Sequence, residues 1–302
     1  MLDNTKINVC LACDNNYSKY AGVVIASILS NANPTDNLEF FILDGGISDE
    51  QKEKIYSLKS INDCNINFIK IDDSLFEDYK KIKTHAYITI ATYYRLKLPS
   101  LLPNVDKIIY LDCDTIVTSS LIDLFNTDIT DYAIAGILDI DKKMLKKNPK
   151  YFNAGVILMN LEFWRKQNLE KFIFNWGKEN INNIKLGDQE ILNEVLKNEV
   201  KIVSDEWNVQ SSNFVNRSSY TNSPKIIHFV AKNKPWGGKS YSYHKNLYFK
   251  YLQLTPWKLS EEDLKKNLKS TALAYVKYRP LFLFRPRFYE ALFETYIKPL
   301  FK

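Results

Sequence analysis

Short apolar runs alternate with helix-like stretches along the first part of the 302-residue chain, and this alternation limits the possible folds more than any other feature. Such alternation is typical of a mainly parallel sheet with helices on both faces. We therefore expect an α/β fold whose ligands bind beyond the carboxyl ends of the strands. The strand-like runs span residues 6–14, 38–46, 65–72 and 105–114, and the helix-like stretches span residues 20–32, 48–61 and 89–102.

The composition excludes several classes of protein. Hydrophobic residues make up 45% of the chain and charged residues 25%, which is ordinary for a folded soluble domain. No run approaches the roughly 20 apolar residues of a membrane-spanning helix, and the polar first residues do not resemble a secretion signal, so we expect a cytoplasmic protein. The chain has nine glycines and no GxGxxG, which disfavours a dinucleotide site, and nothing in it resembles a nucleic-acid-binding module.

Two carboxylates, Asp112 and Asp114, follow the apolar run of the segment KIIYLDCDTIV. In a strand, residues two apart point to the same face, so both carboxylates would aim at one spot if the strand ends there. Like charges that close repel unless a cation lies between them, and carboxylate oxygens suit Mg²⁺ or Mn²⁺. The alternative is that both residues only form the turn at the end of the strand.

A third metal ligand is needed, because two carboxylates cannot complete the shell of a six-coordinate ion. His228 follows the short apolar run of the segment KIIHFV. An imidazole beside two carboxylates favours Mn²⁺ somewhat over Mg²⁺, whereas a histidine near a strand can also be an ordinary core residue. We therefore predict a metal site formed by Asp112, Asp114 and His228.

A second enzyme class also contains the DxD pattern. In the haloacid-dehalogenase-like phosphatases, the nucleophilic aspartate lies in an apolar run followed by DxDx(T/V). Here Ile116 stands at the last position of that motif, and the motif lies far from the N-terminus. The segment GDQEILNE imitates the further acidic pair of that class only loosely. A phosphatase therefore stays as an alternative.

Six segments, in this order, resemble the retaining glycosyltransferases of family 8, which include glycogenin and bacterial lipopolysaccharide galactosyl- and glucosyltransferases. The segments are ACDNNY (12–17), ATYYRLKLP (91–99), IIYLDCDTIV (108–117), FNAGVILMNLEFWR (152–165), GDQEILN (187–193) and HFVAKNKPW (228–236). DNNY, FNAGV and a basic aromatic tail make the chain most similar to bacterial lipooligosaccharide α-galactosyltransferases. The resemblance implies a nucleotide-sugar transferase fold of the GT-A type.

The resemblance also implies roles for residues on the nucleotide side. Asp112, Asp114 and His228 match the ligands of a Mn²⁺ ion that bridges to the diphosphate of a UDP-sugar. Lys234 matches the lysine that binds this diphosphate. The positions that match the uridine-binding loop are Asp14, Asn16 and Tyr17.

On the sugar side, Asn153, Asp188 and Gln189 match contacts of the donor sugar, with Asp188 and Gln189 as the catalytic pair. Arg95 matches an arginine that contacts the sugar and the diphosphate, and Asp139 stands where the family places a donor- or acceptor-side carboxylate. The Gln189 carbonyl oxygen matches the electron-rich group that an oxocarbenium-like sugar requires, and covalent attack and simple stabilisation both stay open. The GDQ segment alone also fits a helix start with Asp188 as N-cap.

Two positions depart from the pattern of the family. Ala231 stands where HFxGxxKPW would have glycine, so its methyl group would crowd the diphosphate. Asn15 replaces a common aspartate in the first loop, which would alter contacts at the nucleotide end.

The C-terminal part differs from the rest in charge. Residues 225–302 carry 16 Lys and Arg against 5 Asp and Glu, whereas residues 1–224 carry 25 against 30. Nine aromatic residues lie from Tyr275 to Phe301, among basic ones. This mixture is typical of a segment that binds an anionic membrane surface, although it also fits aromatic residues packed on the body.

The sequence thus predicts a catalytic domain over residues 1–257 and a helical, membrane-associating tail over residues 258–302. The expected reaction is the metal-dependent, retaining transfer of galactose or glucose from a UDP-hexose to a saccharide acceptor, such as the core of lipopolysaccharide or lipooligosaccharide. The further expected partner is an anionic membrane, which the tail binds from the cytoplasmic side so that a lipid-linked glycan is within reach. The alternative from another class is a catalytically silent UDP-sugar-binding protein, which the presence of all candidate ligands disfavours.

Overall fold

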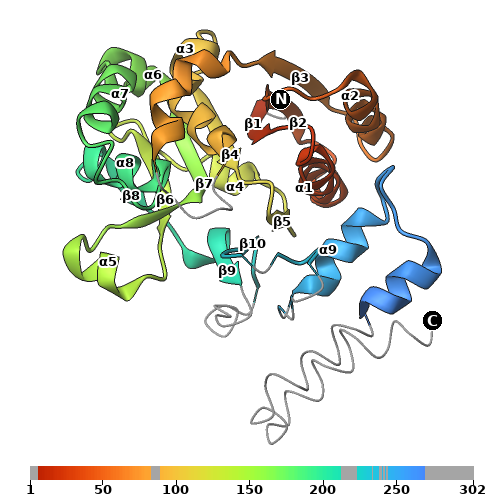
Figure 1. Ribbon diagram of the computed structural model, residues 1–302. Coiled ribbons are helices and arrows are strands. Elements are labelled where there is room, and N and C mark those ends of the chain that lie inside the picture. The colour runs from red at the N-terminus through yellow and green to blue at the C-terminus, as the bar shows by residue number, and fades with distance from the viewer. Residues whose placement is uncertain are drawn as a thin grey trace, which may run out of the picture.

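Figure 1 shows the computed structural model of the chain, in which helices surround the strands. The structure describes residues 6–82, 89–211, 223–232, 234–237, 240, 242 and 244–268. Within these residues, the predicted alternation of strands and helices is confirmed.

The larger sheet has seven strands in the order β3-β2-β1-β4-β7-β6-β8. Its pairs are parallel except where β7 meets β4 and β6, so β7 is the reversed strand among these seven. The sheet is therefore mainly parallel, as predicted. The strands are β1 (Lys6–Cys13), β2 (Asn37–Asp44), β3 (Asn65–Lys70), β4 (Lys107–Leu111), β6 (Ile134–Leu138), β7 (Phe152–Asn160) and β8 (Val200–Ile202).

The helices follow the predicted stretches with two differences. The stretch 48–61 forms an α-helix followed by a 3-10 helix. The stretch 89–102 forms a 3-10 helix and a short α-helix instead of one α-helix, because Pro99 lacks the N–H that a continuous helix would need there. The helices are α1 (Ser18–Asn31), α2 (Asp49–Tyr56), η1 (Ser57–Ser60), η2 (Asp73–Lys81), η3 (Ile90–Lys97), α3 (Leu98–Leu101), α4 (Ile122–Phe125), α5 (Lys142–Lys147), α6 (Leu161–Lys166), α7 (Leu169–Glu179), α8 (Asp188–Val195), η4 (Asp205–Asn208) and α9 (Lys245–Leu252).

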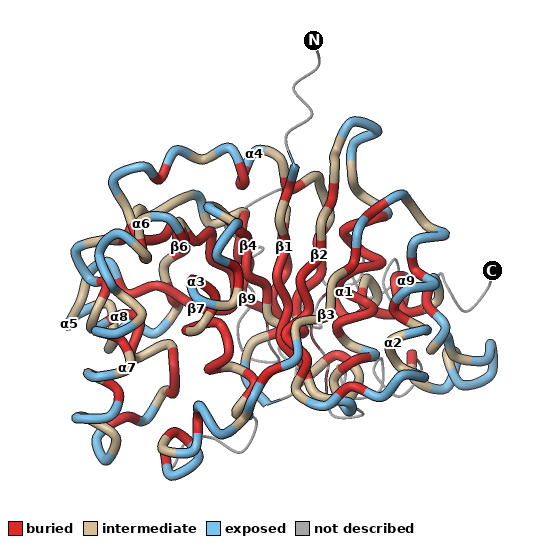
Figure 2. Tube along the Cα trace, turned by 90° about the horizontal axis from the view of Figure 1, so that it is seen from above, coloured by how far each residue is buried: buried red, intermediate tan, exposed pale blue. Residues whose placement is uncertain are grey.

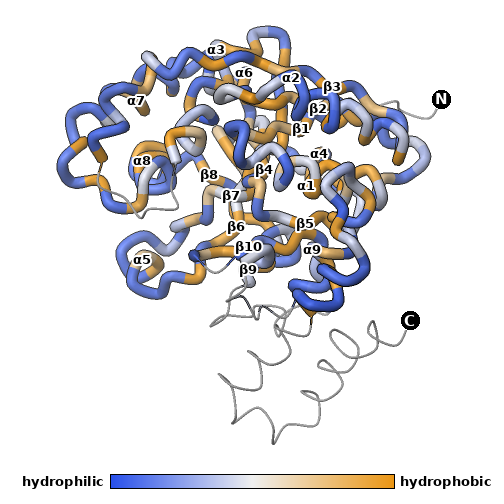
Figure 3. The backbone as a smooth tube through the Cα atoms, turned by 45° about the vertical axis from the view of Figure 1, so that its right-hand side comes forward, coloured by the Kyte–Doolittle hydropathy of each residue, from blue (hydrophilic) through white to orange (hydrophobic). Residues whose placement is uncertain are grey.

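Two apolar cores cover opposite faces of the larger sheet, because successive side chains of a strand point to opposite faces. On β1, Ile7, Val9 and Leu11 belong to the core that contains α1 and α2, whereas Cys10 and Ala12 belong to the core that contains α6, α7 and α8. Figure 2 shows the buried strands in the middle and exposed segments around them, and Figure 3 shows the strands as the more hydrophobic part. This three-layer arrangement confirms the predicted fold class.

A second sheet has three strands in the order β5-β10-β9, which are β5 (Thr115–Val117), β10 (Ile226–Phe229) and β9 (Val209–Ser211). Its apolar side chains form a third core with α9 and with Val23 of α1. Leu268 belongs to this core, so packing on the body continues past residue 257, where the predicted tail begins. The rest of that tail, residues 269–302, lies outside the described residues.

Trp257 joins the C-terminal part of the chain to α1 and α2. Its indole Nε1 donates to Gln51 Oε1 at 2.9 Å, and a Cβ built on Gly22 of α1 would lie 2.3 Å from Trp257 Cζ3. Ser48 caps α2 by accepting a hydrogen bond from the Gln51 N–H. Glycine weakens a helix, so its place inside α1 is explained by the close approach of the indole.

Gly22→Ala should therefore lower the free energy of unfolding. Alanine favours a helix over glycine by about 1 kcal/mol, but overpacking against the indole costs about 1–3 kcal/mol. Urea denaturation followed by tryptophan fluorescence measures the sum. Ser30→Ala, at an exposed position of the same helix, is the control and should not lower stability. A clear gain of stability in Gly22→Ala would contradict the packing argument.

Candidate active site

The carboxyl ends of the parallel strands border a cavity of 440 Å³. Because β7 is reversed, its beginning lies at this same edge of the sheet, beside the ends of β4 and β6. Of the residues predicted for the site, Asn16 is exposed and does not line the cavity. The predicted residues that do line it are Asp14, Tyr17, Arg95, Asp112, Asp114, Asp139, Asn153, Asp188, Gln189, His228 and Lys234.

Asp112 and Asp114 lie in the turn between β4 and β5, not in a strand. The Thr115 N–H closes this turn on the Asp112 carbonyl oxygen at 3.2 Å. The turn, and not the alternation of side chains along a strand, brings the two carboxylates to the same side of the chain. The predicted convergence is therefore right, but the reason given for it is wrong. Between them, the Cys113 thiol points inward and donates to the Ala12 carbonyl oxygen at 3.3 Å.

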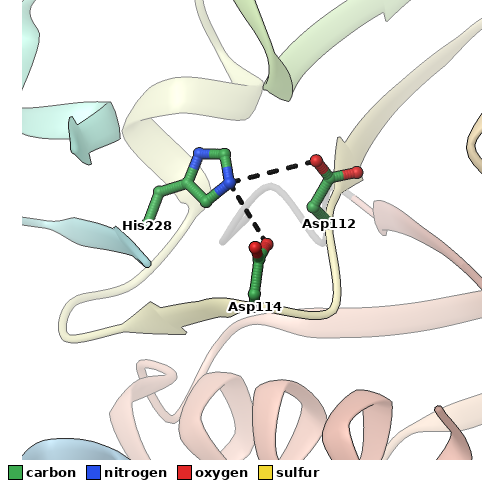
Figure 4. Close-up of side chains that lie close together, drawn as sticks. All are labelled: Asp112, Asp114 and His228. Atoms are coloured by element: carbon green, nitrogen blue, oxygen red, sulfur yellow. Dashed lines mark ion pairs between the residues drawn. The ribbon is translucent and has the colours of Figure 1, made fainter. Parts of the chain in front are cut away.

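His228 completes what we call the metal group: Asp112, Asp114 and His228. It lies on β10 opposite Thr115 of β5, and this register carries its imidazole to the turn. Its Nε2 lies 3.1 Å from Asp114 Oδ1 and 3.9 Å from Asp112 Oδ2 (Figure 4). One ligand atom from each residue lies within 4.8 Å of the other two. Two oxygens and one nitrogen at this spacing can bind a divalent cation.

Gly155 of β7 keeps space free beside the metal group. A Cβ at this position would lie 2.2 Å from His228 Cε1 and 2.7 Å from Asp112 Oδ2, so any side chain would displace the ligands. Asp114 Oδ1 is buried. Among the described residues, its one polar partner is the imidazole of His228, with which it forms an ion pair. The residues present therefore fit a metal ion.

Lys234 balances the charge of Asp114. Its ammonium donates a hydrogen bond to Asp114 Oδ2, with which it forms an ion pair, and another to the Phe229 carbonyl oxygen at 2.9 Å. Burial opposes the charged form of Asp114, but Lys234 and His228 outweigh this effect and hold the pKa of that carboxyl below its usual range. The lysine predicted to bind the diphosphate thus lies next to the metal group.

Arg95 is the buried cation of the site, with 1% of its surface exposed. Its Nη2 donates to Asp112 Oδ1 at 2.7 Å. Its Nε donates to the Thr92 carbonyl oxygen at 2.8 Å and also forms an ion pair with Asp188 Oδ2 at 2.9 Å. Nη1 donates to the Ala154 carbonyl oxygen. The guanidinium carbon lies 3.9 Å from the centre of the Tyr110 ring, a cation–π contact. Since each guanidinium nitrogen has a partner in the protein, Arg95 holds the two carboxylates in place.

Asn153 and Gln189, predicted to contact the donor sugar, and Asp139, predicted as a donor- or acceptor-side carboxylate, form what we call the sugar-side cluster. Asp139 Oδ2 accepts hydrogen bonds from Asn153 Nδ2 at 3.0 Å and from Gln189 Nε2 at 3.2 Å. Gln189 Oε1 accepts from the Ala154 N–H at 3.0 Å and from Asn153 Nδ2 at 3.3 Å. Carboxylate and amide groups of this kind bind sugar hydroxyls.

Asp188 is the first residue of α8, and the N-cap is Gly187. The prediction of Asp188 as N-cap is therefore wrong: Gly187, with a φ of 66°, adopts a left-handed conformation that suits glycine, and the helix begins after it. Asp188 is 4% exposed. Burial raises the pKa of Asp188 to about 6, even though Arg95 favours the charged form.

The residues predicted for uridine binding lie at the beginning of α1. Asp14 Oδ1 accepts from the Tyr17 N–H at 2.9 Å. Burial, more than any other cause, raises the pKa of Tyr17 to about 12, so its phenol stays protonated. Tyr17 lies edge-on to Tyr20, which stacks on Trp236 with ring centres 3.7 Å apart. Three aromatic rings therefore gather at the start of α1, and Tyr17 is the one among them that lines the cavity.

Both departures from the family pattern have structural counterparts. Ala231 lines the cavity and has a φ of 67°, in the left-handed region that glycine adopts freely. An L residue there costs about 1–2 kcal/mol, which explains the glycine of the pattern. Asn15 Oδ1 accepts from the Ser48 N–H at 3.0 Å and so ties the first loop to the start of α2.

The residues of the site that were not predicted from the sequence include Tyr110, Gly155 and Asn208. Gly155 had a signal, because a glycine inside an apolar strand often marks a close approach. Tyr110 and Asn208 had none, since an aromatic residue in a strand and an asparagine in a short loop are both common. Only the fold brings Asn208 to His228 and Asn153.

The fold and the site define an α/β enzyme, and comparison with known proteins gives its class. The model of glycosyl transferase family 8 matches residues 8–240, and the chain belongs to this family. A putative glycosyltransferase of Haemophilus influenzae is 34% identical over 247 residues, which cover 77% of this chain and 74% of that protein. The lipopolysaccharide 1,2-glucosyltransferase of Escherichia coli is 29% identical over 303 residues, which cover 91% and 87%. The crystal structure of the galactosyltransferase LgtC with donor and acceptor sugar analogs superimposes with a TM-score of 0.73 at 27% identity, covering 86% of this chain and 100% of that one.

These comparisons confirm the resemblance to family 8, the GT-A type of fold and the enzyme class, a hexosyltransferase. They give no support to the phosphatase alternative. In the part of the chain that the structure describes, no helix has the length and apolar character needed to cross a membrane.

The raised pKa of Asp188 predicts pH-dependent stability of the metal-free protein. In the unfolded chain an aspartate titrates near about 3.9, whereas in the folded protein the pKa is about 6. Between these two pH values, Asp188 is mostly protonated in the folded protein and mostly ionised in the unfolded chain. The contribution of Asp188 to stability therefore falls as the pH rises from about 4 to about 6, by up to about 3 kcal/mol.

Asp188→Asn removes this titration and isolates it from those of other groups. Urea denaturation at about pH 4.5 and about pH 7.5 gives the free energies of unfolding of both proteins. The value for the wild type minus the value for the variant should decrease with rising pH. A difference that stays constant would mean that Asp188 titrates as in the unfolded chain.

Proposed function

We propose that the chain transfers galactose or glucose from a UDP-hexose to a saccharide acceptor, with retention at the anomeric carbon and with Mn²⁺ as the metal. One observation carries this proposal: the metal group and the sugar-side cluster line the same cavity. A diphosphate bound at the metal group would have its sugar within reach of the cluster. Family membership supports the reaction class.

The leaving diphosphate gains negative charge as the bond to the hexose breaks. A Mn²⁺ ion in the metal group would supply Lewis acidity that stabilises this charge. Lys234 would add a second positive charge, because a phosphate oxygen can replace Asp114 as the partner of its ammonium. Arg95 keeps Asp112 oriented toward the ion position through its hydrogen bond of 2.7 Å.

The hexose develops positive charge at the same time, and the sugar side must stabilise it. Asp139 and Asp188 contribute carboxylates, which also accept hydrogen bonds from sugar hydroxyls. Gln189 Oε1 already accepts hydrogen bonds from Ala154 and Asn153. We therefore assign to Gln189 electrostatic stabilisation instead of covalent attack. Attack by the acceptor on the face that the diphosphate leaves gives retention.

The choice of donor and acceptor rests on the relatives. One is named a lipopolysaccharide 1,2-glucosyltransferase, and one solved structure is of a galactosyltransferase. We therefore propose glucose or galactose as the sugar and the core of lipopolysaccharide or lipooligosaccharide as the acceptor. The two hexoses differ in the configuration of one hydroxyl group, so the geometry of the sugar-side cluster decides between them.

We further propose that residues 1–257 are the catalytic domain and that the tail, residues 258–302, binds an anionic membrane on its cytoplasmic face through the part that follows Leu268. The composition supports this: nine aromatic residues lie from Tyr275 to Phe301 among basic ones. Aromatic and basic residues suit an anionic interface. A lipid-linked acceptor would then lie at the surface to which the enzyme binds.

Release of UDP from a panel of UDP-sugars, with Mn²⁺ and with excess chelator, tests the reaction. We expect metal-dependent release from UDP-galactose or UDP-glucose. Asp114→Asn, which removes a ligand charge, and Gly155→Ala, whose methyl group would meet the ligands, should each reduce the rate by at least about 100-fold. Asp128→Asn changes an exposed carboxylate outside the cavity and is the matched control.

Each other outcome contradicts a stated part of the proposal. Release that is equal with and without chelator would exclude the metal. UDP binding without release, even with saccharide acceptors added, would favour the silent sugar-nucleotide-binding protein. The absence of UDP binding would exclude the donor.

Truncation after Leu268 tests the membrane proposal while keeping the third core intact. The full chain should sediment with vesicles that contain anionic lipid, less so at high salt, and the truncated chain should not. Vesicles of neutral lipid are the control. Equal sedimentation of both proteins would show that the tail does not bind the membrane.

A further inference from the structure

Asn208 is a buried polar residue that is absent from the residues lining the cavity. It ends η4, and 0% of its surface is exposed. Its Nδ2 donates to Asn153 Oδ1 at 3.0 Å, and its Oδ1 lies 3.2 Å from His228 Nδ1. One amide therefore joins the sugar-side cluster to the metal group.

The backbone fixes the direction of these hydrogen bonds. The Gly155 N–H donates to Asn153 Oδ1 at 3.1 Å, so this atom of the amide is the oxygen. Asn153 Nδ2 in turn donates to the carboxylate of Asp139. Since a carbonyl oxygen only accepts, Asn208 must present its NH₂ group to Asn153. The carbonyl oxygen of Asn208 therefore faces His228.

This orientation decides which nitrogen of His228 carries a proton. The nitrogen that faces the Asn208 oxygen, Nδ1, must be the donor. Nε2 lies on the other side of the ring, 3.1 Å from Asp114 Oδ1, so without a metal ion its N–H pairs with this carboxylate. A metal ion would take the place of that proton, and the imidazole that stays protonated on Nδ1 would present its Nε2 lone pair to the ion. Metal-binding histidines commonly donate their second N–H to a carbonyl or carboxylate, which fixes the tautomer and the ring orientation.

We propose that Asn208 is a positioning residue. Its amide is oriented by the hydrogen bond to Asn153, and its carbonyl oxygen then holds the Nδ1 proton of His228, so that Nε2 faces the position of the metal ion. This inference rests on the proposed function, because it assigns Asn208 to the metal site of that reaction. Asn208 acts through His228 and Asn153 and contacts neither ion nor sugar.

Binding of Mn²⁺ and of Mg²⁺ to the metal-stripped full-length protein, measured by calorimetry without a sugar nucleotide, tests the inference. Asn208→Ala removes the acceptor of the Nδ1 proton and should weaken Mn²⁺ binding by about 10–100-fold. Mg²⁺ relies more on oxygen ligands and should lose much less affinity. Asn208→Asp keeps an acceptor for the Nδ1 proton but no longer donates to Asn153, so its Mn²⁺ affinity should be higher than that of Asn208→Ala and lower than that of the wild type.

Asn160→Ala is the matched control. Asn160 also makes two side-chain hydrogen bonds, to the Ile129 carbonyl oxygen and from the Phe163 N–H, but at the opposite end of β7. Its loss should leave the affinity for both metals unchanged. If Asn208→Ala does not fold, Asn208→Ser replaces it with the same expectation.

The outcomes separate this inference from the proposed function. Unchanged Mn²⁺ affinity in Asn208→Ala, an equal loss for both metals, or no rescue by Asn208→Asp would overturn the role of Asn208 and leave the proposed function intact. A wild-type protein that binds no Mn²⁺ would overturn the proposed metal site and this inference together.

Discussion

One buried guanidinium makes this site possible. Four carboxylates, Asp112, Asp114, Asp139 and Asp188, gather at one edge of the sheet, and the last two are buried. Carboxylates so close together need a positive partner. Arg95 pairs with two of them. Breaking a buried pair leaves an uncompensated charge and costs about 3–5 kcal/mol. The neighbouring elements therefore pack around Arg95: η3 carries it, β4 supplies the Tyr110 ring beneath it, and β7 supplies a carbonyl oxygen.

The reversed direction of β7 places backbone N–H and carbonyl groups at the edge of the sheet that borders the cavity. Parallel strands bring their last residues to this edge, whereas β7 brings its first. The Gly155 N–H orients the Asn153 amide, and the Gly155 carbonyl oxygen accepts from the Asp112 N–H at 2.9 Å. One short segment thus supports both the metal group and the sugar-side cluster. A sheet of purely parallel strands would have to supply these groups from loops.

The sequence was sufficient for the fold class, and eleven of the twelve residues predicted for the site line the cavity, because both leave local signals. Apolar runs mark the strands, and the ordered motifs of family 8 mark the carboxylates and His228. The turn at Asp112 and Asp114 was not predictable from the apolar run, since the run does not reveal where the strand ends. Asn208 was not predictable because its partners, Asn153 and His228, are distant in sequence.

The contact between the two ends of the described chain has a consequence for synthesis on the ribosome. Asn31 on α1 donates to the hydroxyl group of Tyr251, 220 residues later, at 2.8 Å. At a synthesis rate of about 5–20 residues per second, this side of α1 stays exposed for about 10–40 s until the segment around Tyr251, which packs on it, has been synthesised. His228 is also translated late. The first 160 residues can therefore supply six of the seven strands of the larger sheet, but only a chain that extends past His228 can assemble the metal group.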